Sequence, residues 1–177
     1  LVGSEMCIRD RPTGAGKSIC YQVPAIMFGG VTIVVSPLIS LMKDQVNALV
    51  KQGVKAAYIN SSLTDTQYDK VLKNAALGNY KIIYVAPERL ESVSFINLCR
   101  RIKISMVAVD ESHCVSQCGQ DFRPSYLNIN KFISVLPNRP IIGAFTATAT
   151  DEVKKDIINI LKLNNPTVVT TEFDRPN

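Results

Sequence analysis

Short apolar runs separated by longer amphipathic stretches constrain the fold of this chain more than any other feature. The runs are rich in Val and Ile, and their apolar character is nearly continuous instead of alternating. That pattern is typical of strands that are buried on both faces. The predicted strands are residues 31–36, 55–60, 81–86, 104–110, 140–146 and 167–171.

The stretches between these runs have the period of a helix. Over 38–51, apolar residues recur about every 3.6 positions. Thr64 and Asp65 are suited to begin a second helix over 64–77, and Thr150 is suited to cap a helix over 151–162. A further helix is expected over 125–136. Alternating strands and helices predict an α/β domain with a mainly parallel sheet and helices on both faces.

A glycine-rich segment before a helical stretch predicts a phosphate-binding loop. Its backbone N–H groups would surround phosphate oxygens, Lys17 would reach the terminal phosphates, and the Ser18 hydroxyl would ligate Mg²⁺. The general pattern requires Gly at position 11, where this chain has Arg11. The residues just before the loop are too charged and too few to predict the usual preceding strand, and a chance glycine-rich turn is the alternative. The expected loop residues are Pro12, Thr13, Gly14, Ala15, Gly16, Lys17 and Ser18.

Two adjacent carboxylates follow the predicted strand at 104–110. Ligands of open α/β sheets bind at the carboxyl ends of strands. Asp110 would hold Mg²⁺, and Glu111 would orient and deprotonate the attacking water in nucleoside triphosphate hydrolysis. His113 would relay the state of the nucleotide. The alternative is an acidic strand end that only faces solvent.

Composition narrows the classes of partner and site. A net charge of +5 favours an anionic partner about as much as it favours an ordinary basic protein. One His excludes a site built from several imidazoles, and five Cys without a CxxC pair indicate reduced, intracellular thiols. No apolar run approaches the about 18 residues of a membrane-spanning helix, so no membrane partner is expected.

Six motifs stand in order along the chain: PTGAGKS, SPLISLMKDQV, APERL, VDESHCVSQCGQDFRP, FTATAT and FDRPN. Together they resemble the first motor domain of RecQ-family DNA helicases, which are superfamily 2 enzymes with a DEAH-like acid motif. The resemblance covers residues 12–177. It implies a RecA-like P-loop NTPase fold, with ATP and Mg²⁺ as ligands and single-stranded or partially duplex DNA as partner.

The resemblance also implies roles for residues outside the nucleotide site. Ser36, Pro37, Lys43 and Gln45 would follow the phosphates of single-stranded DNA. A second loop that contacts the backbone would contain Pro87 and Arg89. Such contacts are independent of sequence and sensitive to salt.

Residues 116–124 resemble the family's aromatic-rich loop, which couples DNA binding to ATP hydrolysis. Phe122 and Arg123 match its pattern as DNA contacts. Cys118 stands where the family usually has Trp, and this exchange removes stacking area. The coupling residues implied by the resemblance are Gln117, Cys118, Gln120, Thr146 and Thr148, with Gln120 standing where the family often has His.

The resemblance implies that the chain is part of a larger motor. Residues 1–11 are expected to be an artefactual leader unlike the family, and the adenine-recognising motif is expected upstream of Pro12 but is missing. The second RecA-like domain, which would follow Asn177, is the expected partner within the full-length chain. We expect the full-length protein to be a 3′-to-5′ helicase of DNA repair and recombination, and the fragment to unwind nothing.

Two alternatives stay open from the sequence. The first is a DNA-binding module that does not hydrolyse ATP, and the second is another phosphate-loop enzyme such as a nucleotide kinase. The kinase hypothesis leaves SPLISLMKDQV and FTATAT without a role. The expected location is the cytoplasm, with the nucleoid, in a bacterium or the nucleus in a eukaryote, and a bacterial source is favoured.

Overall fold

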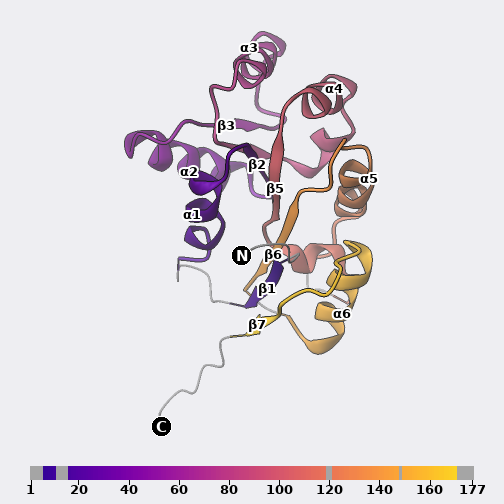
Figure 1. The fold of residues 1–177 in the computed structure, drawn as a ribbon. Coiled ribbons are helices and arrows are strands. Elements are labelled where there is room, and N and C mark those ends of the chain that lie inside the picture. The colour runs from indigo at the N-terminus through magenta and orange to yellow at the C-terminus, as the bar shows by residue number, and fades with distance from the viewer. Residues whose placement is uncertain (1–5, 11–15, 119–120, 148, 171–177) are drawn as a thin grey trace.

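A seven-stranded parallel sheet forms the centre of the computed structural model, which describes residues 6–10, 16–118, 121–147 and 149–170 (Figure 1). The strand order is β3-β4-β2-β5-β6-β1-β7, and every paired neighbour runs parallel. The six predicted strands are confirmed, each within two residues of its expected start. The strands are β1 (Met6–Asp10), β2 (Val31–Val35), β3 (Ala56–Ile59), β4 (Ile82–Val85), β5 (Ile104–Val109), β6 (Ile141–Thr146) and β7 (Val169–Thr170).

Strand β1 corrects the sequence analysis, which expected no strand before the phosphate loop. Its backbone pairs with β6 on one side, where Asp10 lies opposite Thr146. On the other side Asp10 lies opposite Thr170 of β7. Two neighbours that are distant in sequence supply its hydrogen bonds, so the tertiary context overrides the weak strand propensity of a charged segment.

Helices cover both faces of the sheet, as predicted (Figure 1). Residues of α1 and α2 join a core cluster on one face, and residues of α3 to α6 join the cluster on the other. Helix α4 has no counterpart among the predicted helices. The helices are α1 (Ile19–Met27), α2 (Ile39–Lys51), α3 (Asp65–Ala76), α4 (Val93–Arg101), α5 (Asn128–Ser134) and α6 (Asp151–Ile160).

The predicted helix starts are confirmed in detail. The Thr64 hydroxyl accepts a hydrogen bond from the Gln67 amide, and the Gln67 side chain accepts one from the Thr64 amide. This reciprocal pair satisfies two amides that have no partner within the helix. Thr150 caps α6 in the same way by accepting from the Val153 amide at 3.3 Å. The segment predicted as a helix over 125–136 begins as a 3-10 turn over Pro124–Leu127 before α5.

Alternation along the strands divides the core into two layers. Ile33 and Val35 of β2 pack against α3 to α6, whereas Val34 packs against α1 and α2. Phe95 of α4 stacks on Phe132 of α5 with ring centroids 5.6 Å apart. Because both layers are filled, the sheet is a rigid frame that fixes the loops at its carboxyl edge. In the described part of the chain, no helix is long and apolar enough to cross a membrane.

Candidate nucleotide site

A cavity of about 290 Å³ lies at the carboxyl edge of the sheet. It gathers the end of the predicted phosphate loop, the acid pair after β5 and residues of α1 and α2. Segments nearly a hundred positions apart in sequence therefore meet here, as the sequence predicted. The lining residues are Gly16, Lys17, Ser18, Tyr21, Leu41, Gln45, Asp110 and Glu111.

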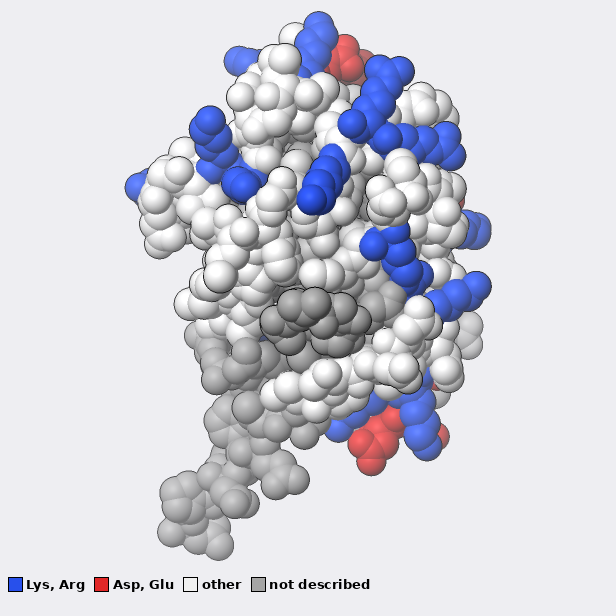
Figure 2. All heavy atoms as spheres, viewed as in Figure 1, with Lys and Arg blue, Asp and Glu red and all other residues white. Residues whose placement is uncertain are grey.

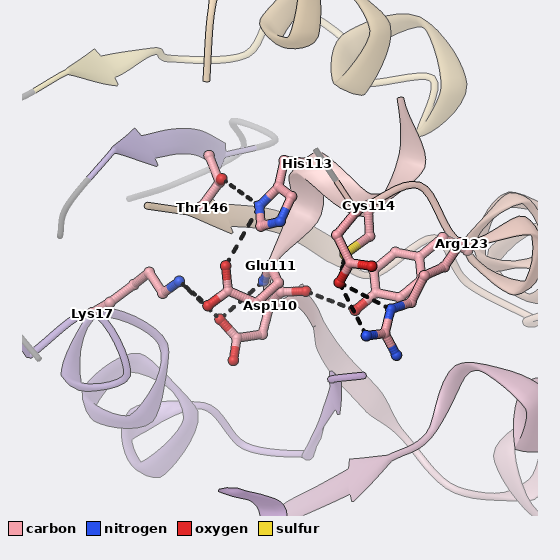
Figure 3. Close-up of polar contacts among 9 residues, drawn as sticks. Lys17, Asp110, Glu111, His113, Cys114, Arg123 and Thr146 are labelled. Carbon is pink, nitrogen blue, oxygen red and sulfur yellow. Dashed lines mark hydrogen bonds and ion pairs between the residues drawn. The ribbon is translucent and has the colours of Figure 1, made fainter. Parts of the chain in front are cut away.

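Lys17 pairs with both acids (Figure 3). Its Nζ lies 2.5 Å from Glu111 Oε1, to which it donates a hydrogen bond, and 3.6 Å from Asp110 Oδ1. The Lys17 and Asp110 side chains are only 10% and 5% exposed. Solvent screens such a pair weakly, so one ammonium group balances much of the charge of two carboxylates.

Burial dominates the electrostatics of Asp110. Loss of water around this carboxylate raises its pKa above the ordinary value of 3.8, and the charge of Lys17 opposes that shift without cancelling it. The charge of Glu111 raises the pKa further. Burying the charged form of a carboxylate costs free energy, so a carboxylate that is nevertheless held in a pocket is a candidate functional residue.

The raised pKa of Asp110 predicts a stability cost that depends on pH. The folded state binds the proton more tightly than the unfolded state, so stability falls as pH rises from about the unfolded pKa through the folded one. Asp110→Asn is therefore expected to be more stable than the parent at pH 7, with the difference shrinking as pH falls toward 4. Denaturant unfolding at several pH values measures this. Asp69→Asn, an exposed change on α3, is the control, and an unchanged difference across pH contradicts the prediction.

The backbone positions the acid pair firmly. The Asp110 amide donates to Val35 O at 2.8 Å, and Tyr126 Oη donates to Asp110 O at 2.9 Å. Glu111 has φ 48°, a left-handed conformation that is uncommon for a residue other than glycine. Strain of this kind persists where surrounding contacts enforce it, and it clusters at functional sites. Here it turns the chain so that the Glu111 side chain faces Lys17.

His113 connects the acid pair to the end of β6 (Figure 3). Its Nδ1 lies 2.9 Å from Thr146 Oγ1 and 3.5 Å from Glu111 Oε2. The structure thus joins three residues for which the sequence predicted related roles. The imidazole of His113 therefore lies between Glu111 and the end of β6 at Thr146.

The residues present suit a nucleotide with a divalent cation. Gly16 has φ 74°, which a residue with a side chain rarely adopts. Ser18 and Asp110 offer the hard oxygen ligands that Mg²⁺ prefers. Of the predicted loop, Pro12, Thr13, Gly14 and Ala15 lie outside the described residues.

The sequence profile of the DEAD/DEAH box helicases matches residues 1–156. The chain belongs to this helicase family. It is 52% identical over 166 residues to the ATP-dependent DNA helicase RecQ of Bacillus subtilis, covering 94% of this chain and 28% of that protein. It is 48% identical to the RecQ helicase of Pasteurella multocida and 45% identical to the helicase wrn-1 of Caenorhabditis elegans, covering 93% of this chain in both comparisons and 26% and 16% of those proteins. The chain thus spans less than a third of these relatives.

Solved helicase structures share the fold. The Hef helicase domain of Pyrococcus furiosus superposes with a TM-score of 0.72 at 18% identity, covering 94% of this chain and 36% of that one. The DUF1998 helicase MrfA bound to DNA superposes with a TM-score of 0.74 at 17% identity, covering 94% and 25%. With the parallel sheet and its two helical layers, these similarities show the predicted RecA-like α/β fold.

Two segments predicted to contact DNA meet at one place in this helicase domain. Arg123 Nη1 donates to Pro37 O at 3.4 Å, which joins the loop after the acid motif to the loop after β2. Arg123 also forms a fork with Asp121, at 3.2 Å from Nε and 3.0 Å from Nη2. The neighbouring Ser36 hydroxyl is buried and has no hydrogen-bond partner among the described residues.

The other predicted residues of the SPLISLMKDQV segment lie on α2. Lys43 is exposed, whereas the Gln45 side chain lines the nucleotide cavity. Gln45 Oε1 accepts a hydrogen bond from Gln22 Nε2 at 2.7 Å, and the same nitrogen lies 2.9 Å from Tyr84 Oη. Helices α1 and α2 are therefore tied together directly beside the cavity.

The remaining predicted residues are spread along the carboxyl edge. Pro87 is buried, and the Arg89 guanidinium lies over the Tyr68 ring at 5.5 Å. Phe122 is half-buried, and Gln117 and Cys118 are exposed on the loop that follows the acid motif. The Ser116 hydroxyl donates to Asp156 of α6 at 2.5 Å and anchors the start of that loop. Gln120 and Thr148 lie outside the described residues.

Sequence reasoning missed several residues that shape the site. Tyr21 and Leu41 line the cavity, Gln22 connects α1 to Gln45, and Tyr126 supports Asp110. Tyr21 could have been found, because it lies four positions after Lys17 on the first turn of α1 and so shares its face. Tyr126 has no such signal, since only the tertiary fold brings it to the acid motif.

Proposed function

We propose that this chain is the first motor domain of an ATP-dependent 3′-to-5′ DNA helicase of RecQ type. The full-length protein would unwind partially duplex DNA during repair and recombination. The proposal includes a second RecA-like domain after Asn177, whose surface would complete the ATP cleft. The similarity to bacterial RecQ helicases supports a place beside bacterial DNA in the cytoplasm.

The contact of Lys17 with both acids carries the proposal. In a hydrolysing site the lysine binds the terminal phosphates, and the acids serve the metal and the water. Because Lys17 contacts both acids, the groups proposed to bind the phosphates, the metal and the attacking water lie within one site. When ATP binds, Lys17 exchanges carboxylate oxygens for phosphate oxygens.

The two acids then take separate roles. Asp110 and Ser18 would hold Mg²⁺, which would neutralise part of the phosphate charge. Glu111, released by Lys17, orients the attacking water and accepts its proton. His113 stays between Glu111 and Thr146, so loss of the terminal phosphate is transmitted to β6.

Single-stranded DNA binds along the carboxyl edge. Ser36, Pro37, Lys43, Pro87, Arg89, Phe122 and Arg123 are the proposed contacts. Arg123 Nε and Nη2 both donate to a single oxygen, Asp121 Oδ2, and a phosphate oxygen is proposed to take the place of that carboxylate oxygen. The residues proposed to couple DNA binding to hydrolysis are Gln117, Cys118, Gln120, Thr146 and Thr148. Gln45, which the sequence predicted as a DNA contact, is proposed to join them because its side chain lines the candidate nucleotide cavity.

The test is ATP turnover by a longer chain that continues into the second motor domain, with and without single-stranded DNA. DNA is expected to stimulate turnover strongly. Absence of turnover contradicts the proposed hydrolysis, and turnover that DNA does not change contradicts the helicase role.

Thr146→Val tests the coupling path in the same assay. Valine keeps the shape of threonine but has no hydroxyl to form the hydrogen bond with His113 Nδ1. Stimulation by DNA is therefore expected to fall roughly tenfold while basal turnover is retained. Thr146→Ser keeps the hydroxyl and should restore stimulation. Equal stimulation in all three proteins would remove Thr146 from the coupling path.

A further inference from the structure

Another cavity lies at the opposite edge of the sheet from the candidate nucleotide site. It has a volume of about 600 Å³ and lies between the end of α4, the start of β5 and the connection from α5 to β6. A second hollow of about 330 Å³ shares Gly29, Arg101, Ile102 and Lys103 with it. The two hollows are therefore adjacent, and we call them together the groove; no Asp or Glu lines either of them.

The chain around this groove is basic throughout. The connections that lead from a helix into the next strand are residues 28–30, 52–55, 77–81, 102–103, 135–140 and 161–168. They contain no Asp or Glu, and all but the first carry a Lys or Arg. We define the amino edge as these cations together with those at the ends of α2 and α4: Lys51, Lys55, Lys81, Arg100, Arg101, Lys103, Arg139 and Lys162.

The carboxyl edge differs. Its described connections carry the acids Glu88, Glu91, Asp110, Glu111 and Asp121 together with the cations Lys17, Arg89 and Arg123. Acids therefore outnumber cations in the described connections of the carboxyl edge, whereas the connections of the amino edge contain cations and no acids. Figure 2 shows a face on which Lys and Arg side chains are spread widely, with Asp and Glu mainly near its upper and lower margins.

The cations of the groove are exposed or held by neutral groups. Arg101 and Lys103 are exposed. Lys81 Nζ donates to Phe28 O at 3.0 Å, and Arg100 Nε donates to Val135 O at 3.3 Å. These carbonyls orient the side chains without cancelling their charge. No salt bridge within the described residues involves Lys81, Arg100, Arg101 or Lys103.

Strand spacing arranges these cations in a row. Lys55, Lys81 and Lys103 each stand directly before a strand, β3, β4 and β5 respectively, and β2 lies between the last two. Neighbouring strands are about 4.8 Å apart, so the row from β3 to β5 spans about 14 Å. Gly29 and Gly30 precede β2 in the middle of the row. A Cβ on Gly30 would collide with Ser105 Oγ and Lys103 O, so glycine is required where the chain passes this close to the start of β5.

We propose that the amino edge binds the phosphate backbone of double-stranded DNA. A row of cations at the edge of a packed sheet, with no acids in the same connections, matches a stiff and regularly charged duplex. The inference rests on the proposed function, since DNA is the polyanion that a helicase motor meets. The site is separate from the proposed single-strand contacts, which lie about 20 Å away at the other end of the six-residue strand β5.

Cations at the ends of helices also offset the helix dipole. That role affects stability, whereas the proposed role affects DNA affinity and its dependence on salt. The two can be measured separately on the same variants.

The test uses a blunt 20-base-pair duplex, which offers no single strand to the carboxyl edge. Its binding to this chain is followed by fluorescence anisotropy over a series of salt concentrations. The double variant Arg101→Gln/Lys103→Gln removes two cations of the groove. Lys131→Gln/Lys155→Gln removes two exposed cations from α5 and α6 and is the control of equal charge.

The groove variant should bind the duplex on the order of tenfold more weakly at low salt, and its slope of log affinity against log salt should fall by about two. The control should stay within twofold of the parent. Equal losses in both variants overturn the proposal, as does a groove variant that loses stability but no DNA affinity. Loss of binding to anionic phospholipid vesicles, with duplex binding intact, also overturns it.

Binding of a fluorescent ATP analogue to the same proteins separates this inference from the proposed function. If a longer chain that continues into the second motor domain, and so has a complete cleft, fails to bind the analogue, the proposed function is contradicted. If nucleotide binding is intact and the groove variant matches the control on duplex DNA, only the amino-edge proposal fails.

Discussion

Replacing Glu111 by Gln is expected to lower ATP turnover by about 10²- to 10⁴-fold, the usual contribution of a general base. The amide keeps the size and shape of the side chain but cannot accept the proton of the attacking water. Gln also tolerates the left-handed backbone at this position about as well as Glu, so the loop should keep its path. Turnover is measured on the longer chain with both motor domains, in the presence of single-stranded DNA.

Nucleotide binding by Glu111→Gln should be retained or strengthened. In the structure Lys17 is engaged by Glu111 at 2.5 Å, and the substitution removes that competing charge. Asp110, at 3.6 Å, is then the one acid of the pair whose contact Lys17 must give up to bind the phosphates. Retained nucleotide binding together with lowered ATP turnover would show that Glu111 acts in hydrolysis and not in binding.

Glu152→Gln is the matched control, because Glu152 is an exposed acid in the first turn of α6. It should leave turnover unchanged. If Glu111→Gln and its control turn over ATP at the same rate, Glu111 is not the base. If all three proteins show only background turnover, the non-hydrolysing DNA-binding module is the better description of the domain.

Replacing Phe95 by Ala is expected to lower the free energy of unfolding by about 3–5 kcal/mol. Phe95 is fully buried and stacks on Phe132, so the change removes apolar contact and leaves a cavity between α4 and α5. Denaturant unfolding followed by circular dichroism measures the effect. A loss of this size is a large part of the stability of a domain of this length.

Val93→Ala on the same helix is the control. Val93 is 74% exposed, so its truncation should change the free energy of unfolding by less than about 0.5 kcal/mol. Equal effects at the two positions would show that α4 does not pack on the sheet as described. This comparison is informative because α4 is the helix that the sequence patterns did not predict.

The elements with strong local patterns were predictable. The continuous apolar runs from Val31 to Val35 and from Ile104 to Val109 could only be stable with both faces covered, and both are buried strands. Thr64 and Thr150 predicted helix starts because their hydroxyls accept hydrogen bonds from backbone amides three residues later. These features depend on interactions close in sequence.

Elements that depend on distant partners were not predictable. Strand β1 exists because β6 and β7 supply its hydrogen bonds, and nothing within Met6–Asp10 signals that pairing. Helix α4 has only nine residues, which is too short a window for its period to stand out. Its stability comes from packing between Phe95 and Phe132.

By itself the sequence determined the kind of chemistry at the nucleotide site. Lys17, Ser18, Asp110 and Glu111 are groups suited to phosphate, metal and water, and the resemblance of six ordered motifs to RecQ-family helicases indicated a helicase motor. The tertiary structure decided which of them touch. It placed Lys17 on both acids, aligned His113 with Thr146, and brought Tyr126 beneath Asp110. It also collected the cations at the starts of separate strands into one edge, because a parallel sheet brings the same end of every strand together.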